Sequence, residues 1–330
     1  MPLHLEEFQG EEFQGYVENV PAAREYILSS FLPVKTTKDI NFAYNVINGK
    51  YAQAASITGF NASAPLRDKK SLEKAFGSVA KVQHGFRLDE NEILRFNRPR
   101  DEEEKAQAVE YVYDETDDLI QGVRDIEEFM RAQVLYNGVL LYDDDENDIH
   151  LNINFGIPEE NKLSVTVEWS DPTSTPLDNI SAGVKRYQDS NKRKKPRVMH
   201  LTSVTEANLL RNEQIKNQVH GNSTDKRLLT RTDLQNVFTA LGLPPYQIND
   251  DVIDLYGQGE VQLLDDNKVV FLGEGLGHTF VGPTVEKNFE TGIYVVPEIK
   301  ETNPPSQAVF VGETVFPALQ RPQSIVIMEV

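Results

Sequence analysis

The sequence predicts an α+β fold, and three observations favour it. Apolar residues recur at helical spacing through residues 101–137. Apolar and polar residues alternate with period two in residues 149–155 and again in residues 163–169. Residues 171–275 mix both periods. Together these patterns predict helices that pack on sheets.

One very long helix is expected. Asp101, with Glu104 three residues later, resembles a capping box, and the Asn-Gly pair at 137–138 is a stop signal. About 36 residues would span about 54 Å. Gly122 and residues 116–118 are points where this helix could bend or break. A coiled coil is the alternative, but about three heptads with acidic flanks support it weakly, so we expect one helix laid across a sheet. Its predicted buried face consists of Val109, Val112, Thr116, Leu119, Val123, Ile126 and Met130.

The N-terminal region is predicted to be a flexible arm. Residues 6–15 repeat Glu-Glu-Phe-Gln-Gly twice, and little apolar material precedes residue 20. A frayed terminus without a role is the alternative. Residues 22–32 are expected to form a short helix that stops at Pro33.

A long hairpin is expected next. Residues 40–60 are rich in strand-forming side chains, and residues 80–88 alternate like a returning strand. Such a hairpin is marginal alone in water, so we expect it to lie on another copy of the chain. Its polar tip supplies candidate intersubunit contacts. These are Arg67, Asp68, Lys69 and Lys70.

Residues 139–330 are expected to hold the remaining helices and strands. A hairpin should pair residues 149–155 with residues 163–169. Residues 323–330 should form a docked C-terminal strand, because the terminus is apolar. Helices are predicted at 178–188, at 203–218 with Ser203 as N-cap, and at 232–241, and strands at 197–201, 246–256 and 269–272.

Composition limits the function. The chain has 330 residues, no cysteine and a net charge of −19, so disulfides and thiolate chemistry are excluded. Residues 101–128 hold 12 acids and two bases, a surface that repels polyanions and argues against sequence-specific DNA binding. Residues 1–10 lack the pattern of a secretory signal, and no apolar run is long enough to span a membrane. We expect folding in the cytoplasm.

No motif predicts an active site, a cofactor or a metal. The glycines at 273, 275 and 277 depart from the dinucleotide-binding spacing, and residues 143–154 lack the glycine and glutamate of a calcium loop. The six histidines are scattered without a metal-binding pair. We therefore expect a protein that is not an enzyme.

One basic cluster stands out on this acidic chain. It consists of Lys192, Arg193, Lys194 and Lys195, with Arg197 close by. Three interpretations remain open: a polyanion site, a solvated loop between a helix and a strand, and a contact with acids of a neighbouring copy. The four residues are candidate intersubunit contacts.

The order of these elements resembles the Hong Kong 97 phage capsid fold, and the sequence most resembles the major head protein E family of lambda-type phages. Three stretches carry the resemblance: residues 61–65, residues 268–273, and residues 310–330 with Glu313. The likeness spans nearly the whole chain, although the repeat at 6–15 has no expected counterpart. It implies an N-terminal arm (1–40), an extended loop (41–98), a spine helix (99–138), a peripheral domain (139–170 and 276–330) and an axial domain (171–275).

The resemblance also implies a function. Such a protein self-assembles, through hexamers and pentamers, into the icosahedral head that encloses double-stranded DNA, and it ends up in the virion. Scaffolding protein and portal are implied partners, and a decoration protein is a further candidate. DNA would be contacted without specificity, and no membrane or cofactor is implied. An encapsulin-like compartment and a hydrolase with a dispersed site are the alternatives.

Overall fold

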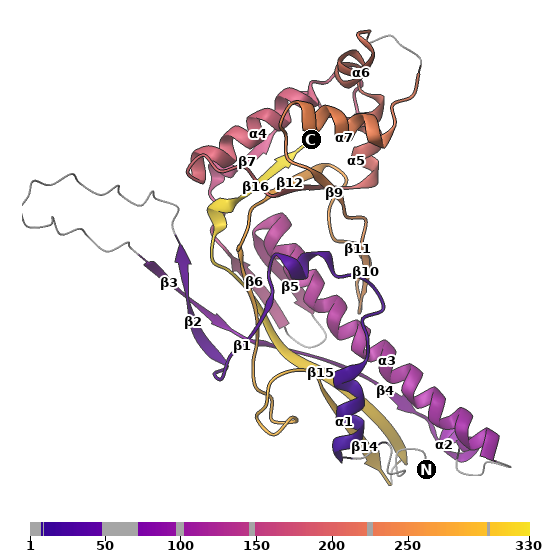
Figure 1. Cartoon of the computed structure of the whole chain (residues 1–330). Helices are drawn as coiled ribbons and strands as arrows, with labels where there is room; N and C mark the ends of the chain where they lie inside the picture. The colour runs from indigo at the N-terminus through magenta and orange to yellow at the C-terminus, as the bar shows by residue number, and fades with distance from the viewer. Residues whose placement is uncertain are drawn as a thin grey trace, which may run out of the picture. The chain divides into compact units, whose positions relative to one another are not determined.

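The computed structural model describes residue 8 and residues 10–47, 72–96, 102–144, 149–222, 227–301 and 304–330 (Figure 1). The chain forms two compact units. Unit 1 comprises Met1–Ala43, Phe76–Arg131 and His278–Ala318, and unit 2 comprises Tyr44–Ala75, Ala132–Gly277 and Leu319–Val330. Within the described ranges no helix has both the length and the apolar character needed to cross a membrane.

Unit 1 is built on a five-stranded sheet. Its strand order is β1-β13-β15-β14, and β4 also pairs with β15. The 14-residue β15 is the longest strand among the described residues and is buried along most of its length, and it places Val309 opposite Phe86 of β4. The strands are β1 (Val34–Thr36), β4 (Ala80–Leu88), β13 (Gly277–Val281), β14 (Tyr294–Lys300) and β15 (Ser306–Leu319).

The predicted long helix is confirmed. Helix α3 spans Glu102–Ala132, a further π-helical turn covers Gln133–Asn137, and Gly138 ends it in the left-handed conformation at φ 70°. Val112, Leu119 and Val123 are buried against the valines of β15, as expected for a helix laid on a sheet. The predicted capping residue Asp101 lies outside the described residues.

Gly122 does not break α3, and its role is close packing. A Cβ atom at this position would collide with the imidazole ring of His84 on β4. The ring also hydrogen-bonds through Nε2 to the carbonyl oxygen of Leu119, so it cannot simply move away. The glycine therefore allows helix and sheet to approach each other here.

We expect Gly122→Ala to lower the free energy of unfolding by about 1–3 kcal/mol, because an added methyl overpacks this contact. The same change at an open helical site normally stabilises by up to about 1 kcal/mol. Urea denaturation should show this gain for Gly15→Ala in α1 (Gly10–Asn19), where nothing lies near the new methyl. In a His84→Ala background, Gly122→Ala should become stabilising; an unchanged penalty there would contradict the clash.

The prediction of a flexible arm over residues 1–20 is wrong for the part that is described. Helix α1 carries Phe13 and Val17 into the core of unit 1, and Phe8 is buried with them. The repeat places its two phenylalanines edge to face, 5.3 Å apart. The helix predicted at 22–32 is also wrong, since only the 3-10 turn η3 (Ile27–Ser30) forms.

The hairpin prediction is partly wrong. β2 (Asn41–Ile47) pairs with β3 (Leu72–Ser78), a strand that the sequence did not indicate. Residues 80–88 do form a strand, β4, but it pairs with β15. Helix α2 (Glu90–Phe96) follows. The tip, with Arg67, Asp68, Lys69 and Lys70, lies outside the described residues.

The hairpin predicted for residues 149–155 and 163–169 is wrong. β6 (Ile149–Asn154) pairs instead with β5 (Val139–Asp144), directly after α3. Residues beyond η5 (Glu159–Asn161) form only the short strand β7 (Lys162–Ser164), which pairs in parallel with the C-terminal strand β16 (Ile325–Glu329). The Asn161 amide donates to the carbonyl oxygen of Ile325 at 2.8 Å, which fixes this pairing. The predicted docked C-terminal strand is confirmed.

Unit 2 contains a second five-stranded sheet, in the order β7-β16-β12-β8-β9. Met199, Phe271 and Val326 lie side by side on one face of its central strands, where helices cover them (Figure 1). The opposite face holds His200, whose Nδ1 hydrogen-bonds to the Tyr136 hydroxyl at 2.7 Å. The remaining strands are β8 (Val198–Leu201), β9 (Tyr246–Ile248), β12 (Lys268–Leu272) and the separate pair β10 (Val252–Leu255) and β11 (Gly259–Gln262).

The helices of unit 2 begin and end close to their predicted limits. The helix predicted at 203–218 is interrupted by Asn212, whose side chain caps a new helix by accepting from the backbone of Gln214 and Ile215. Thr202, and not Ser203, caps the first of the two. The helices are α4 (Pro176–Ser190), α5 (Ser203–Arg211), α6 (Glu213–His220) and α7 (Arg231–Ala240).

Candidate functional site

The predicted basic residues lie on one loop, residues 191–197, which joins α4 to β8 and is called the basic loop below. Lys192 and Arg193 both adopt left-handed backbone conformations, with φ of 55° and 62°. Such conformations are costly for residues other than glycine or asparagine. The backbone N–H of Arg193 donates to the Gln188 carbonyl at 2.9 Å, which closes the end of α4. The loop is therefore held in one defined shape.

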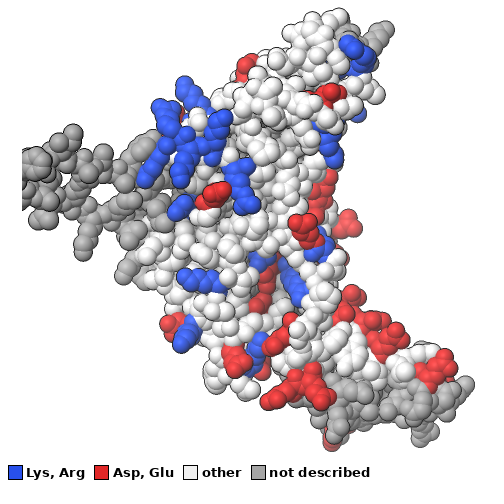
Figure 2. Space-filling model, in the orientation of Figure 1, with Lys and Arg blue, Asp and Glu red and all other residues white. Residues whose placement is uncertain are grey.

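Several cations of the basic loop remain open to solvent. Arg193 forms an ion pair with Asp189 at 2.7 Å, but its side chain remains 69% exposed. Lys195 donates to the Gly242 carbonyl at 2.7 Å, and Lys194 is exposed. Figure 2 shows Lys and Arg side chains gathered over this end of α4. The group can accept carboxylates or phosphates from outside the chain.

A hollow of about 530 Å³ adjoins the basic loop within unit 2. Its wall is mixed, with polar side chains from Gln235 and Thr239 and a cation from Lys195. The side chains that line it include Phe238, Leu243, Pro244, Pro245 and Tyr246.

A second polar site lies in unit 1, where the N-terminal segment follows α3. The Tyr16 hydroxyl donates to Asp117 at 2.6 Å, and Arg24 pairs with Asp125 at 2.8 Å. Asp117 and Asp125 of α3 thus accept hydrogen bonds from the N-terminal segment of the same chain. The Gln14 amide also donates to Ile293 O and accepts from Val295 N, so it occupies part of the open edge of β14. These contacts explain why the segment is ordered.

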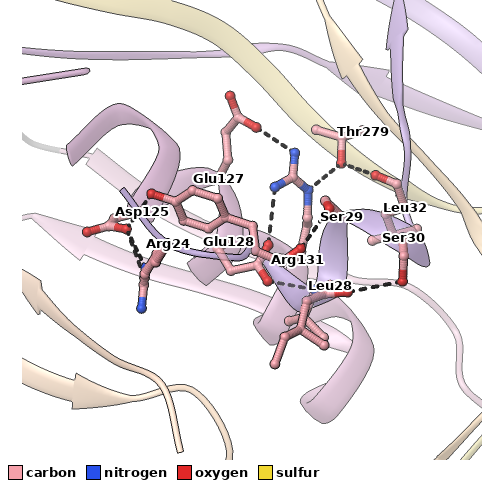
Figure 3. A network of polar contacts seen from close by, with 12 residues as sticks. Arg24, Leu28, Ser29, Ser30, Leu32, Asp125, Glu127, Glu128, Arg131 and Thr279 are labelled. Carbon is pink, nitrogen blue, oxygen red and sulfur yellow. Dashed lines mark hydrogen bonds and ion pairs between the residues drawn. The ribbon is translucent and has the colours of Figure 1, made fainter. Parts of the chain in front are cut away.

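Arg131 is the centre of a buried ion network (Figure 3). It is 3% exposed and pairs with Glu127 and Glu128, both on α3. Its Nε donates to Thr279 Oγ1 at 3.0 Å, and Glu128 accepts the backbone N–H of Leu28 at 2.7 Å. The network therefore ties α3 to β13 and to the N-terminal segment.

Glu313 of β15 completes this network. Its carboxyl is buried and hydrogen-bonds to Glu127. Burial raises the pKa of Glu313 far above 4.5, and the hydrogen bond and negative charge of Glu127 add to the rise, while Arg131 and Lys287 oppose it. The carboxyl is therefore protonated at neutral pH, which avoids a third negative charge next to a single arginine.

Sequence reasoning missed this network, although two signals pointed to it. Glu127 follows Val123 by four residues and so falls on the predicted apolar face of α3. Glu313 has the same strand parity as Val309 and Val311, which are buried. Acids at apolar positions indicate buried, partnered groups.

His200 was one of the scattered histidines of the sequence and is part of the core of unit 2. Burial lowers its pKa from 6.5 to about 4, so the ring is neutral at physiological pH. The Tyr136 hydroxyl that it contacts also accepts from Asn249 at 2.8 Å. The three side chains form a structural hydrogen-bonded chain.

Comparison with known proteins identifies the fold and the family. The family model described as "Phage major capsid protein E" matches residues 12–330. A prophage protein of E. coli CFT073, proposed to be a capsid protein, is 13% identical with a TM-score of 0.64; 97% of this chain and 98% of that chain are covered. A phage-related protein from Bordetella bronchiseptica RB50 is 12% identical with a TM-score of 0.56, over 96% and 95%. No curated protein matches the chain.

The encapsulin alternative is disfavoured by the family match. The SrpI encapsulin of Synechococcus elongatus is 11% identical, with 94% and 90% of the two chains covered, and its TM-score of 0.40 is too low to support an argument. The predicted α+β capsid fold and the predicted resemblance are confirmed. The chain belongs to the Phage major capsid protein E family, so it is a structural subunit that self-assembles into the head shell of a phage virion and is not an enzyme.

Proposed function

We propose that this capsid protein assembles through hexamers and pentamers, and that its basic loop contacts acidic side chains of a neighbouring copy. The observation that carries the proposal is the fixed, outward-facing shape of a cationic loop on a chain whose net charge is −19. Copies of such a chain repel one another on average. A local cluster of opposite sign reduces this repulsion and orients the neighbour.

The acidic partner surface that we propose is the exposed side of α3 on the neighbouring copy. Its exposed carboxylates are Glu103, Glu110, Asp114 and Asp118. They follow one another at spacings of seven, four and four residues and so line one side of the helix. Arginine and lysine reach such a row easily, since both have long side chains.

The domain roles are also proposed, on the basis of the family resemblance. Residues 1–40 are assigned as the N-terminal arm, 41–98 as the extended loop and 99–138 as the spine helix. Residues 139–170 with 276–330 form the peripheral domain, and residues 171–275 form the axial domain. Arg67, Asp68, Lys69 and Lys70 remain proposed contacts of the extended loop. Scaffolding protein, portal, a decoration protein and the packaged DNA are the proposed further partners.

The test reverses two charges of the basic loop in the full-length chain. We expect Arg193→Glu with Lys194→Glu to raise the protein concentration at which shells form by about tenfold. Two exposed ion pairs are lost per copy at up to about 1 kcal/mol each, and like charges then oppose each other. Negative-stain microscopy and light scattering across a dilution series would measure this concentration.

The matched control changes the net charge equally at other exposed positions, with Lys38→Glu and Lys300→Glu. Its threshold should stay within about twofold of the wild type. Equal effects of both pairs would reject a specific role for the basic loop. Shells that form normally but retain less DNA would assign the loop to the packaged genome. A wild-type chain that stays monomeric at every concentration would reject assembly by the chain alone.

A further inference from the structure

The loop that joins β13 to β14 in unit 1 presents two large apolar side chains to solvent. Val285 is 72% exposed and Phe289 is 75% exposed. Exposed single apolar residues are common, but a valine and a phenylalanine on one short loop form a small apolar patch. We call residues 284–290 the β13–β14 loop.

This loop has a defined conformation. The backbone N–H of Phe289 donates to the Thr284 carbonyl at 2.8 Å, and that of Asn288 donates to the Val285 carbonyl at 3.1 Å. A β-bridge between Pro283 and Thr291 closes its base. The bonds fix the backbone at both apolar residues, so little backbone entropy would be lost when a partner covers them.

Two ion pairs fasten the loop to the rest of unit 1. Lys287 reaches Glu18 of α1 at 2.8 Å, and Glu286 pairs with Lys81 of β4. The Lys287 side chain is only 11% exposed, whereas that of its partner Glu18 is 45% exposed. Glu286 and Lys287 therefore bind other parts of unit 1, whereas Val285 and Phe289 face solvent.

The backbone of the loop is strained at Phe289. Asn288 and Phe289 have φ of 53° and 66°, in the left-handed region. Asparagine tolerates this conformation, whereas phenylalanine rarely adopts it. Strain of this kind persists where the surrounding structure enforces it, often at sites of interaction.

We propose that Val285 and Phe289 form an apolar contact with a second copy of this chain in the shell. Each copy carries a net charge of −19, so contacts between copies need apolar burial to offset the repulsion. A rigid aromatic side chain is well suited to the centre of such a contact. The inference rests on the proposed assembly through hexamers and pentamers and adds a second contact surface to it, separate from the basic loop.

The test separates assembly from folding by replacing Phe289 with glycine. Glycine adopts the left-handed conformation without strain, so Phe289→Gly should leave the melting temperature of the unassembled subunit unchanged or raise it. The same variant should raise the threshold concentration for shell formation by about tenfold or more, because the phenyl ring that the contact between copies would bury is lost. Dilution series in light scattering, followed by microscopy, would give this threshold.

Asn288→Gly is the matched control, since it relieves strain at the adjacent residue and keeps the phenyl ring. Its threshold should equal that of the wild type, and Phe289→Leu should restore most of the assembly. If Phe289→Gly assembles at the wild-type threshold, or if both glycine variants weaken assembly equally, the apolar contact is rejected. If wild-type shells do not form either, the proposed self-assembly itself fails.

Shells of Phe289→Gly that form at the wild-type threshold but fail to bind an added decoration protein would assign the patch to that protein. This outcome also rejects the contact between copies.

Discussion

Replacing Arg131 with alanine is expected to lower the free energy of unfolding by about 3–5 kcal/mol. The guanidinium is the cation that Glu127 and Glu128 contact, and both carboxylates are almost completely buried. Without it, two buried carboxylates would lose their ion pairs with this arginine. The hydroxyl of Thr279 would also lose the hydrogen bond that Arg131 donates. Glu128, which accepts the backbone N–H of Leu28, would no longer be held in place by the arginine.

Equilibrium urea denaturation of the unassembled subunit would measure this loss. Lys162→Ala is the matched control, because it removes an exposed ion pair with Glu159 and should cost less than about 1 kcal/mol. Adding Glu127→Gln and Glu128→Gln to an Arg131→Met variant should recover part of the loss, since no uncompensated charge is then buried. A cost for Arg131→Ala as small as that of Lys162→Ala would show that water enters the network.

Stability is expected to fall as pH rises above about 4.5 because of Glu313. Its folded-state pKa is raised above the ordinary value of 4.5, mainly by burial. Below pH 4.5 the carboxyl is protonated in both the folded and the unfolded chain, so it has no effect. Above this pH the unfolded chain releases the proton and is favoured, by up to about 1.4 kcal/mol per pH unit. The loss stops growing only when pH exceeds the folded-state pKa.

Glu313→Gln should remove this dependence, since glutamine keeps the shape and cannot ionise. The free energy of unfolding of the variant, relative to the wild type, should rise by up to about 3 kcal/mol between pH 5 and pH 7. Urea titrations at several pH values would follow the difference. Glu298→Gln, at an exposed position on the neighbouring strand β14, should show no such trend. A constant difference between Glu313→Gln and wild type would place an ionised carboxylate in the core.

The sequence predicted the elements whose signals are local. The spacing from Val109 to Met130 predicted α3, because a helical face repeats within a few residues. Helix α4, helix α7 and strand β12 were found for the same reason. The four cations of the basic loop are adjacent in the sequence and were predicted as a cluster. The left-handed backbone conformation of Lys192 was not predicted.

Partner choice between distant strands was not predictable in the same way. Residues 149–154 alternate correctly, but nothing in their pattern distinguishes β5 from residues 163–169 as the partner. The N-terminal segment was misread because its anchors, such as Asp117 and Glu128, lie about 100 residues away. Charged residues on a helix also look solvated in sequence, so a buried network is easily missed.

The position of the N-terminal segment affects how the chain is made. Leu32 accepts a hydrogen bond from Thr279, which follows it by 247 residues. At about 5–20 residues per second, a ribosome needs on the order of 10–50 s to add that length. During this time β1 cannot pair with β13, because β13 has not yet been synthesised. Phe8 and Phe13 likewise cannot pack against α3 until that helix has been synthesised. Chaperones should therefore be needed to protect nascent capsid chains until translation is nearly complete.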